Sequence, residues 1–225
     1  SIQRNHQKMI EESPSAAVSP ELREKMGHAA VTAAKAAGYV NAGTIEFLLE
    51  PDGKFWFMEM NTRIQVEHPV TEWVTGIDLV KEQLKIASGM PLEIAQEDVR
   101  IQGHAIECRI NAENPQKNFR PSPGTIQGAH FPGGNGIRVD TCVYNGCKIP
   151  PYYDSMLAKL IVHAGNRKEA IAKMQSALGE VIIDGIDTNI DYQYEILKDE
   201  DYQSGNFDTG FLASHIIAGV KINEN

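Results

Sequence analysis

The chain has 225 residues, of which 42% are hydrophobic and 23% charged, and its formal net charge is −9. This acidic balance argues against a surface for nucleic acid or an anionic membrane, and no apolar run reaches the ~20 residues of a membrane span. Cys108, Cys142 and Cys147 form neither a metal-type spacing nor an even disulfide set, which predicts a reducing, cytoplasmic environment.

The first quarter of the chain predicts an edge strand and then a helix. Residues 3–8 form a polar, alternating run that is typical of a solvated edge strand. Ser19 as N-cap, Pro20 at the first helical position and Gly38 as a stop signal bracket the helix. Its predicted inner face consists of Leu22, Met26, Ala29, Ala30 and Ala33.

A β-hairpin is predicted next, because residues 44–50 and 54–61 are rich in β-formers on either side of a Pro-Asp-Gly turn signal. If Asp52 and Gly53 are the two loop residues, Pro51 faces Lys54. The same register places Glu46 directly opposite Glu59, and a β-bulge would shift it by one residue.

This register suggests a metal site. Two carboxylates with Cβ atoms about 5 Å apart repel each other, so a cation is expected between them. Asn61 shares the face of Glu59, and such a small set of hard oxygen ligands suits Mg²⁺ that completes its shell with water and phosphate. The alternative is that Glu46 and Glu59 merely line the solvent face of a two-stranded ribbon.

The loop after the hairpin carries Arg63, Gln65 and Glu67 in alternation with Ile64 and Val66. A guanidinium can bind a planar oxyanion such as bicarbonate through two hydrogen bonds, and a neighbouring carboxylate can take its proton. The alternative is a surface ion pair between Arg63 and Glu67. A proline after His68 predicts that this segment stays extended or turning.

The remainder predicts a helix over residues 78–88, a boundary near Gly89, and then an α+β region. The helix is expected to turn Val80, Leu84 and Ala87 inward. Strands are expected at residues 103–111, 124–131, 137–144 and 156–163, in an antiparallel sheet. A helix capped by Asn166 and Glu169 should bury Ala170, Met174 and Leu178, and residues 188–198 should form a last full helix.

Six motifs in this chain resemble, in order, those of biotin carboxylase, the ATP-grasp component of biotin-dependent carboxylases. They are SIQRNHQK (1–8), EMNTRIQVEHPVTE (59–72), ECRINAE (107–113), PSPG (121–124), PPYYDSM (150–156) and DGIDTN (184–189). The resemblance implies the C-terminal part of an ATP-grasp domain at residues 1–98. A biotin carboxylase C-terminal domain with antiparallel sheet and helices would follow at residues 99–225.

The resemblance also implies roles for individual residues. Glu46, Glu59 and Asn61 would hold Mg²⁺ or Mn²⁺ at the ATP phosphates, and Gln3, His6 and Leu48 would lie near the nucleotide. Bicarbonate would be held by Lys8, Arg63, Gln65 and Val66 and deprotonated by Glu67, while Arg109 would stabilise the enolate-like ureido oxygen of biotin. From the residues alone, Arg109 and Glu107 on one strand face suggest a cross-strand salt bridge rather than a catalytic group.

The implied activity is ATP- and bicarbonate-dependent carboxylation of biotin through carboxyphosphate, the first half-reaction of acetyl-CoA carboxylase in fatty acid synthesis. Biotin would arrive on a biotin carboxyl carrier protein, a carboxyltransferase component would complete the complex, and a homodimer is expected. The chain resembles the C-terminal half of such an enzyme, so it is expected to be inactive alone. Two alternatives are another ATP-grasp ligase that joins a carboxylate to an amine, and a non-catalytic dimerisation module.

Overall fold

The computed structural model describes residues 1–221, which form two compact units. Unit 1 comprises Ser1–Ser13 together with the described residues from Gln102 onward, and unit 2 comprises Pro14–Ile101. The domain division predicted between residues 98 and 99 stays a prediction. The compact units differ from it because residues 10–13 pair with a strand of the C-terminal region. Alternation in the sequence does not reveal this long-range contact.

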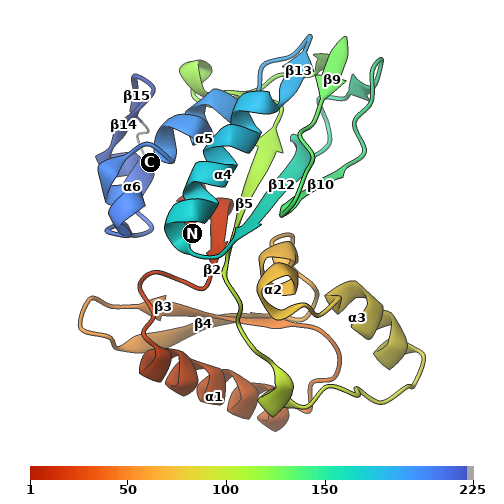
Figure 1. The fold of residues 1–225 in the computed structure, drawn as a ribbon, viewed down its shortest axis with the longest axis vertical. Coiled ribbons are helices and arrows are strands. Elements are labelled where there is room, and N and C mark those ends of the chain that lie inside the picture. The colour runs from red at the N-terminus through yellow and green to blue at the C-terminus, as the bar shows by residue number, and fades with distance from the viewer. Residues whose placement is uncertain (222–225) are drawn as a thin grey trace. The chain divides into compact units, whose positions relative to one another are not determined.

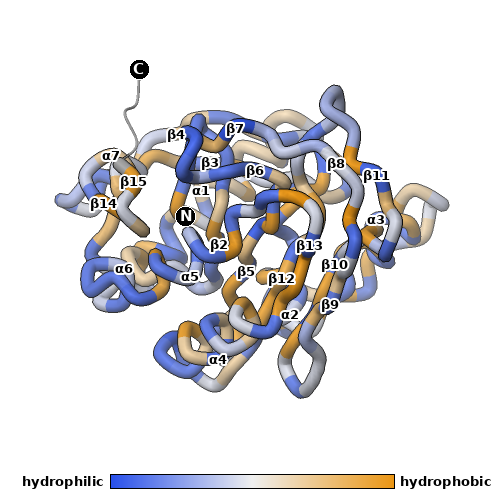
Figure 2. Tube along the Cα trace, turned by 90° about the horizontal axis from the view of Figure 1, so that it is seen from above, coloured by the Kyte–Doolittle hydropathy of each residue, from blue (hydrophilic) through white to orange (hydrophobic). Residues whose placement is uncertain are grey.

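Unit 1 is built on a five-stranded antiparallel sheet in the order β1-β2-β5-β12-β10 (Figure 1). Its strands are β1 (Ile2–Arg4), β2 (Gln7–Ser13), β5 (His104–Asn111), β12 (Met156–Ala164) and β10 (Ile137–Thr141). Ile106, Cys108 and Ile110 are fully buried on one face, as their alternation predicts. Figure 2 shows β5 and β12 as largely hydrophobic stretches of the chain.

Helix α4 (Arg167–Glu180) contributes to the core with β5 and β12. The Asn166 side chain accepts a hydrogen bond from the Glu169 amide at 3.0 Å, and Ala170, Met174 and Leu178 are at most 1% exposed. The predicted N-cap and buried face are therefore confirmed. The Glu169 carboxylate accepts from the amide of Gly165, one residue before the cap.

The C-terminal part of unit 1 contains more helices than predicted. The helix expected at residues 188–198 is the shorter α5 (Ile190–Ile196), and it is not the last. It is followed by α6 (Glu200–Ser204), α7 (Phe211–Ser214) and the short strands β14 (Ile216–Ile217) and β15 (Val220–Lys221). The chain leaves the helical conformation at Asp199, because the side chain of this residue caps the next helix, α6.

The strand predicted at residues 124–131 is wrong. It is two short strands outside the main sheet: β8 (Gly124–Thr125) pairs with β11 (Lys148–Ile149), and β9 (Gly128–His130) pairs with β13 (Ile182–Asp184). The change of partner occurs between Ile126 and Gln127, whose amides donate to Cys147 and Asp184. Unit 1 also holds β6 (Glu113–Asn114), β7 (Arg120–Pro121) and a 3-10 turn at Pro115–Lys117.

Unit 2 contains α1 (Pro20–Ala36), the hairpin β3 (Thr44–Leu49) and β4 (Phe55–Asn61), α2 (His68–Thr75), α3 (Leu79–Ala87) and a 3-10 turn at Gln96–Asp98. Helix α1 begins as predicted, with Ser19 accepting from the Leu22 amide at 3.2 Å and Pro20 at the first position. Gly38 has a φ of 62°, the left-handed conformation that ends many helices.

Two predictions for the helices of unit 2 are wrong. Val80 and Leu84 are 43% and 67% exposed, and Ala87 is exposed as well. Helix α3 instead turns the row containing Leu79, Gln83 and Ile86 toward the rest of the unit. The His68-Pro69 segment starts α2, since proline is tolerated in the first turn of a helix, where its missing N–H has no partner. Within residues 1–221, no helix is long and apolar enough to cross a bilayer.

Candidate functional site

The hairpin of unit 2 places Glu46 directly opposite Glu59, as predicted, but by a different route. Glu50 faces Lys54 across a loop of three residues, because the Glu50 amide donates to the Lys54 carbonyl at 2.8 Å. The predicted two-residue loop is therefore wrong. A bulge between Glu46 and Phe47, with Met58 as the extra residue, shifts the register back and restores the Glu46–Glu59 pair.

The side chains around this pair converge. The Asn61 amide Nδ2 donates to Glu46 Oε1 at 3.1 Å and to Glu59 Oε1 at 2.8 Å. The Gln65 amide Nε2 donates to the same Glu46 oxygen at 2.5 Å. The two carboxylates thus share the amide hydrogens of Asn61. Partially positive hydrogens between them reduce the repulsion that a cation would otherwise have to offset.

This donor set fits a hard divalent cation. Two carboxylate oxygens lie on either side of one amide, and turning that amide over would present its Oδ1 in place of its hydrogens. Oxygen donors of this kind, few in number and open to solvent on the Glu59 side, suit Mg²⁺, which keeps several water ligands.

Arg63 and Glu67 occupy different environments in the loop that follows. Arg63 is exposed and donates to Asn61 Oδ1 at 3.3 Å and to the Ile64 carbonyl at 3.1 Å. Glu67 is only 9% exposed and immediately precedes α2. Because Glu67 is nearly buried, the structure does not favour the alternative of a surface ion pair between Arg63 and Glu67.

Three further predicted residues lie at the start of unit 1. Gln3 faces Lys8 across the β1–β2 turn, and Asn5 and His6 form the loop with φ values of 49° and 60°. Positive φ at both loop residues is the geometry of a tight hairpin turn, and it costs energy in residues other than glycine. His6 is exposed, so the imidazole stands at the tip of this turn.

Arg109 lies on β5 of unit 1, directly opposite Lys159 of β12. Its backbone carbonyl accepts from Asn189 Nδ2 at 3.0 Å and from Gln193 Nε2 at 2.7 Å. Sequence reasoning missed the roles of Asn189 and Gln193. The available signal was the position of these amides in and after the DGIDTN motif, at the start of a predicted helix.

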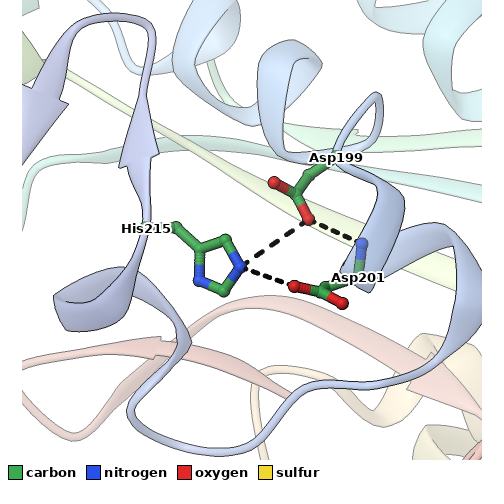
Figure 3. Close-up of side chains that lie close together, drawn as sticks. All are labelled: Asp199, Asp201 and His215. Atoms are coloured by element: carbon green, nitrogen blue, oxygen red, sulfur yellow. Dashed lines mark hydrogen bonds and ion pairs between the residues drawn. The ribbon is translucent and has the colours of Figure 1, made fainter.

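A separate polar cluster in unit 1 joins Asp199, Asp201 and His215 (Figure 3). His215 Nε2 lies 3.0 Å from Asp201 Oδ2 and 4.0 Å from Asp199 Oδ1. The hydrogen bond with Asp201 raises the pKa of His215, and the same bond lowers the pKa of Asp201. Because Asp199 Oδ1 caps α6 and both aspartates already have donors, the cluster is a helix cap with an ion pair.

Two segments of the chain match models of known protein families. Residues 107–214 match the family model of the biotin carboxylase C-terminal domain, and residues 1–95 match that of the carbamoyl-phosphate synthase L chain, ATP binding domain. The chain is 58% identical to biotin carboxylase 1 of Bacillus subtilis over 220 residues, which are 97% of this chain and 49% of that protein. It is 54% identical to the biotin carboxylase of Haemophilus influenzae, covering 94% of this chain and 47% of that protein.

Solved structures give the same result. The biotin carboxylase domain dimer of Hydrogenobacter thermophilus 2-oxoglutarate carboxylase, in complex with MgADP, ADP and bicarbonate, matches with a TM-score of 0.92 at 51% identity. The biotin carboxylase subunit of pyruvate carboxylase matches with a TM-score of 0.92 at 52% identity. Each match covers 94% of this chain and 47% of the other. The chain thus spans about half the length of the relatives it matches.

Proposed function

This chain belongs to the biotin carboxylase family, and from that premise we propose that it supplies part of the site at which biotin is carboxylated with ATP and bicarbonate. The observation that carries the proposal is the hairpin pair, in which Glu46 and Glu59 share the amide of Asn61. Pairing of two carboxylates on a partly exposed hairpin has no benefit for stability, and it supplies the ligands that a nucleotide-bound cation needs.

Glu46, Glu59 and Asn61 would hold Mg²⁺, or Mn²⁺ in its place, and the ion would neutralise phosphate charge during phosphoryl transfer. Gln65 supports this arrangement because its amide fixes Glu46 Oε1. Gln3, His6 and Leu48 would contact the nucleotide. The exposure of His6 on its hairpin turn and the 53% exposure of Leu48 leave both side chains available for a ligand.

Bicarbonate would be bound by Lys8, Arg63, Gln65 and the backbone of Val66. Arg63 suits this role because its guanidinium is exposed and held by Asn61 and Ile64. Glu67 would take the bicarbonate proton, after which a bicarbonate oxygen attacks the γ-phosphate and ADP leaves.

The carboxyphosphate formed in this way splits into carbon dioxide and phosphate. In the family's reaction this phosphate would accept the N1 proton of biotin, which would free N1 to bond to the carbon of carbon dioxide. Arg109 would stabilise the negative charge that develops on the ureido oxygen, in the manner of an oxyanion donor. The rigid strand β5, anchored at the Arg109 carbonyl, suits a residue that must hold a fixed position.

We further propose the partner proteins, the oligomeric state and the cellular location of this reaction. Biotin would be presented on a biotin carboxyl carrier protein, and a carboxyltransferase component would use the product. A homodimer is supported by the dimer named for the Hydrogenobacter relative. A cytoplasmic location is supported by Cys108, Cys142 and Cys147, none of which forms a disulfide.

The test is ADP release by the complete protein that contains this chain, measured against bicarbonate with and without free biotin. Release that requires bicarbonate and rises with biotin supports the proposal. Release that ignores biotin and responds to an amine would identify an ATP-grasp ligase that joins a carboxylate to an amine. No ATP cleavage under any condition would leave the chain as a non-catalytic dimerisation module.

A further inference from the structure

Strand β5 loses one of its neighbours at the point where it carries Arg109. The pairing of β2 with β5 runs from Ser13 opposite Ala105 to Ile10 opposite Cys108. Beyond Cys108, the edge of β5 on that side presents the carbonyl of Arg109 and the amide and carbonyl of Asn111 to other partners.

Asn189 takes the place of the missing strand. Its Oδ1 accepts from the Asn111 amide at 2.9 Å, its Nδ2 donates to the Arg109 carbonyl at 3.0 Å, and its own backbone amide donates to the Asn111 carbonyl at 3.2 Å. A carboxamide carries one acceptor and one donor in a plane, as a peptide group does, so it can imitate a neighbouring strand. Because Oδ1 faces an N–H donor and Nδ2 faces a carbonyl acceptor, these two partners define the orientation of the Asn189 side-chain amide.

This use of Asn189 is not the ordinary one for its position. Asn189 stands at the N-cap of α5, where asparagine usually bonds to the helix amides, yet its side chain makes no capping hydrogen bond. It is 0% exposed and directed to β5 instead. Helix formation therefore does not explain why an asparagine is buried here.

Gln193, one turn further along α5, reaches the same carbonyl. Its Nε2 donates to Arg109 O at 2.7 Å, and the residue is 0% exposed. Among the residues that the structure describes, its Oε1 has no hydrogen-bond partner. A buried, unpaired amide oxygen reduces stability, and an apolar side chain of similar length would avoid it. Within the described residues, the hydrogen bond that this buried side chain contributes is therefore the one to the Arg109 carbonyl.

On the other edge of β5, Arg109 faces Lys159, and a bulge at Leu157 interrupts the pairing with β12 between Ile110 and Asn111. The pairing with β12 is thus continuous through Arg109 and Ile110, whereas on the β2 side the pairing ends at Cys108 and the backbone is held by Asn189 and Gln193. We propose that Asn189 and Gln193 are positioning residues that fix the backbone of β5 so that the Arg109 side chain is held in place for carboxylation of biotin. This inference rests on the proposed function and assigns a role to the end of the DGIDTN motif and the first turns of α5.

The test uses three variants of the complete protein that contains this chain. Gln193→Met removes only the donor and the unpaired oxygen, so its melting temperature should stay the same or rise. Asn189→Ala removes two side-chain hydrogen bonds to β5. Asn166→Ala is the matched control, because it removes the side-chain cap of α4 and lowers stability without touching Arg109.

Two rates are measured for each variant: biotin-dependent ADP release, with kcat and KM for free biotin, and bicarbonate-dependent ATP cleavage without biotin. We expect kcat for the biotin-dependent rate to fall about 10- to 100-fold in Asn189→Ala and about 3- to 10-fold in Gln193→Met, since small displacements of a catalytic group have effects of this size. ATP cleavage without biotin should change much less. Asn166→Ala should keep the ratio of the two rates.

Equal losses of both rates in Gln193→Met and Asn189→Ala, or no loss in either, would overturn the inference. If Asn189→Ala does not fold, Gln193→Met decides the matter alone, because its stability is expected to be retained. Failure of the proposed function is distinguishable, since it would appear as an absence of biotin-stimulated release in the unsubstituted protein.

Discussion

Glu12→Gln is expected to destabilise unit 1 more than any single surface change. Glu12 on β2 is 8% exposed, and its Oε2 lies 2.7 Å from both His104 Nε2 and Arg167 Nε. Arg167 Nη2 donates to the other carboxylate oxygen at 3.2 Å. Burial alone would raise the pKa of Glu12, but the hydrogen bonds from His104 and Arg167 outweigh it and the pKa is lowered.

The loss of stability in Glu12→Gln depends on which interactions of the carboxylate a glutamine can still make. It retains one acceptor oxygen but loses the charge and turns an NH₂ group toward a donor. Hydrogen bonds to charged groups contribute about 1.5–3 kcal/mol each. Arg167 keeps the carbonyls of Tyr202 and Gln203 as acceptors at 2.8 Å and 2.7 Å, so the guanidinium is not left without partners. The expected loss is therefore about 2–4 kcal/mol, which overlaps the lower part of the ~3–5 kcal/mol for a fully broken buried pair.

Thermal unfolding near neutral pH measures this loss, and at roughly 2–4 °C per kcal/mol the melting temperature should fall by about 4–16 °C. The matched control is Glu195→Gln, which breaks only an exposed pair with Lys198 and should change stability by less than about 0.5 kcal/mol. A fall no larger than that of the control would refute the reasoning.

Acid pH provides a second test of the same group. The folded pKa of Glu12 lies below its ordinary value of 4.5, so the carboxylate contributes stability above that value. This contribution is lost as the pH falls through the lowered pKa. The difference in stability between the parent protein and Glu12→Gln should therefore shrink on acidification, and a constant difference would contradict the assignment.

Three other predictions concern the site and the C-terminal cluster. Glu59→Gln should raise the Mg²⁺ concentration needed for ADP release by at least about 10-fold, whereas Glu50→Gln on the same hairpin should leave it unchanged; equal requirements would exclude Glu59 as a ligand. Arg109→Ala should lower biotin carboxylation about 100-fold and bicarbonate-dependent ATP cleavage much less; equal losses in both assays would remove its assigned role. The pKa of His215 is raised, so His215→Gln should be less stable than the parent below about pH 6.5 and lose this difference as the pH rises through the raised pKa. Urea unfolding near pH 6 and near pH 9 checks this, and a larger deficit at the higher pH would contradict it.

Local signals determined several features in advance. The Ser19 cap and the Gly38 stop of α1 depend on neighbouring backbone groups, so sequence is sufficient to predict them. The alternation along β5 is likewise a local pattern, and it separates Ile106 and Ile110, which are buried in the core, from Glu107 and Arg109 on the other face. The Glu46–Glu59 pair was predicted through a loop one residue too short, and the bulge at Met58 compensated for the error. The roles of the site residues came from the family motifs, because a polar residue on a strand does not indicate its ligand.

The sequence by itself thus determined the α+β class, the caps of α1 and α4, the buried face of α4 and the motifs that identify the family. Tertiary structure alone decided that residues 1–13 join the C-terminal sheet through β2 and β5, that α3 turns Val80 and Leu84 outward, and that the Asn189 amide bonds to Arg109. The physical reason is the distance along the chain between the residues that interact. Propensity and periodicity describe the backbone of a residue and the side on which its side chain lies, whereas strand partners and buried hydrogen bonds depend on segments about 80 or more residues away.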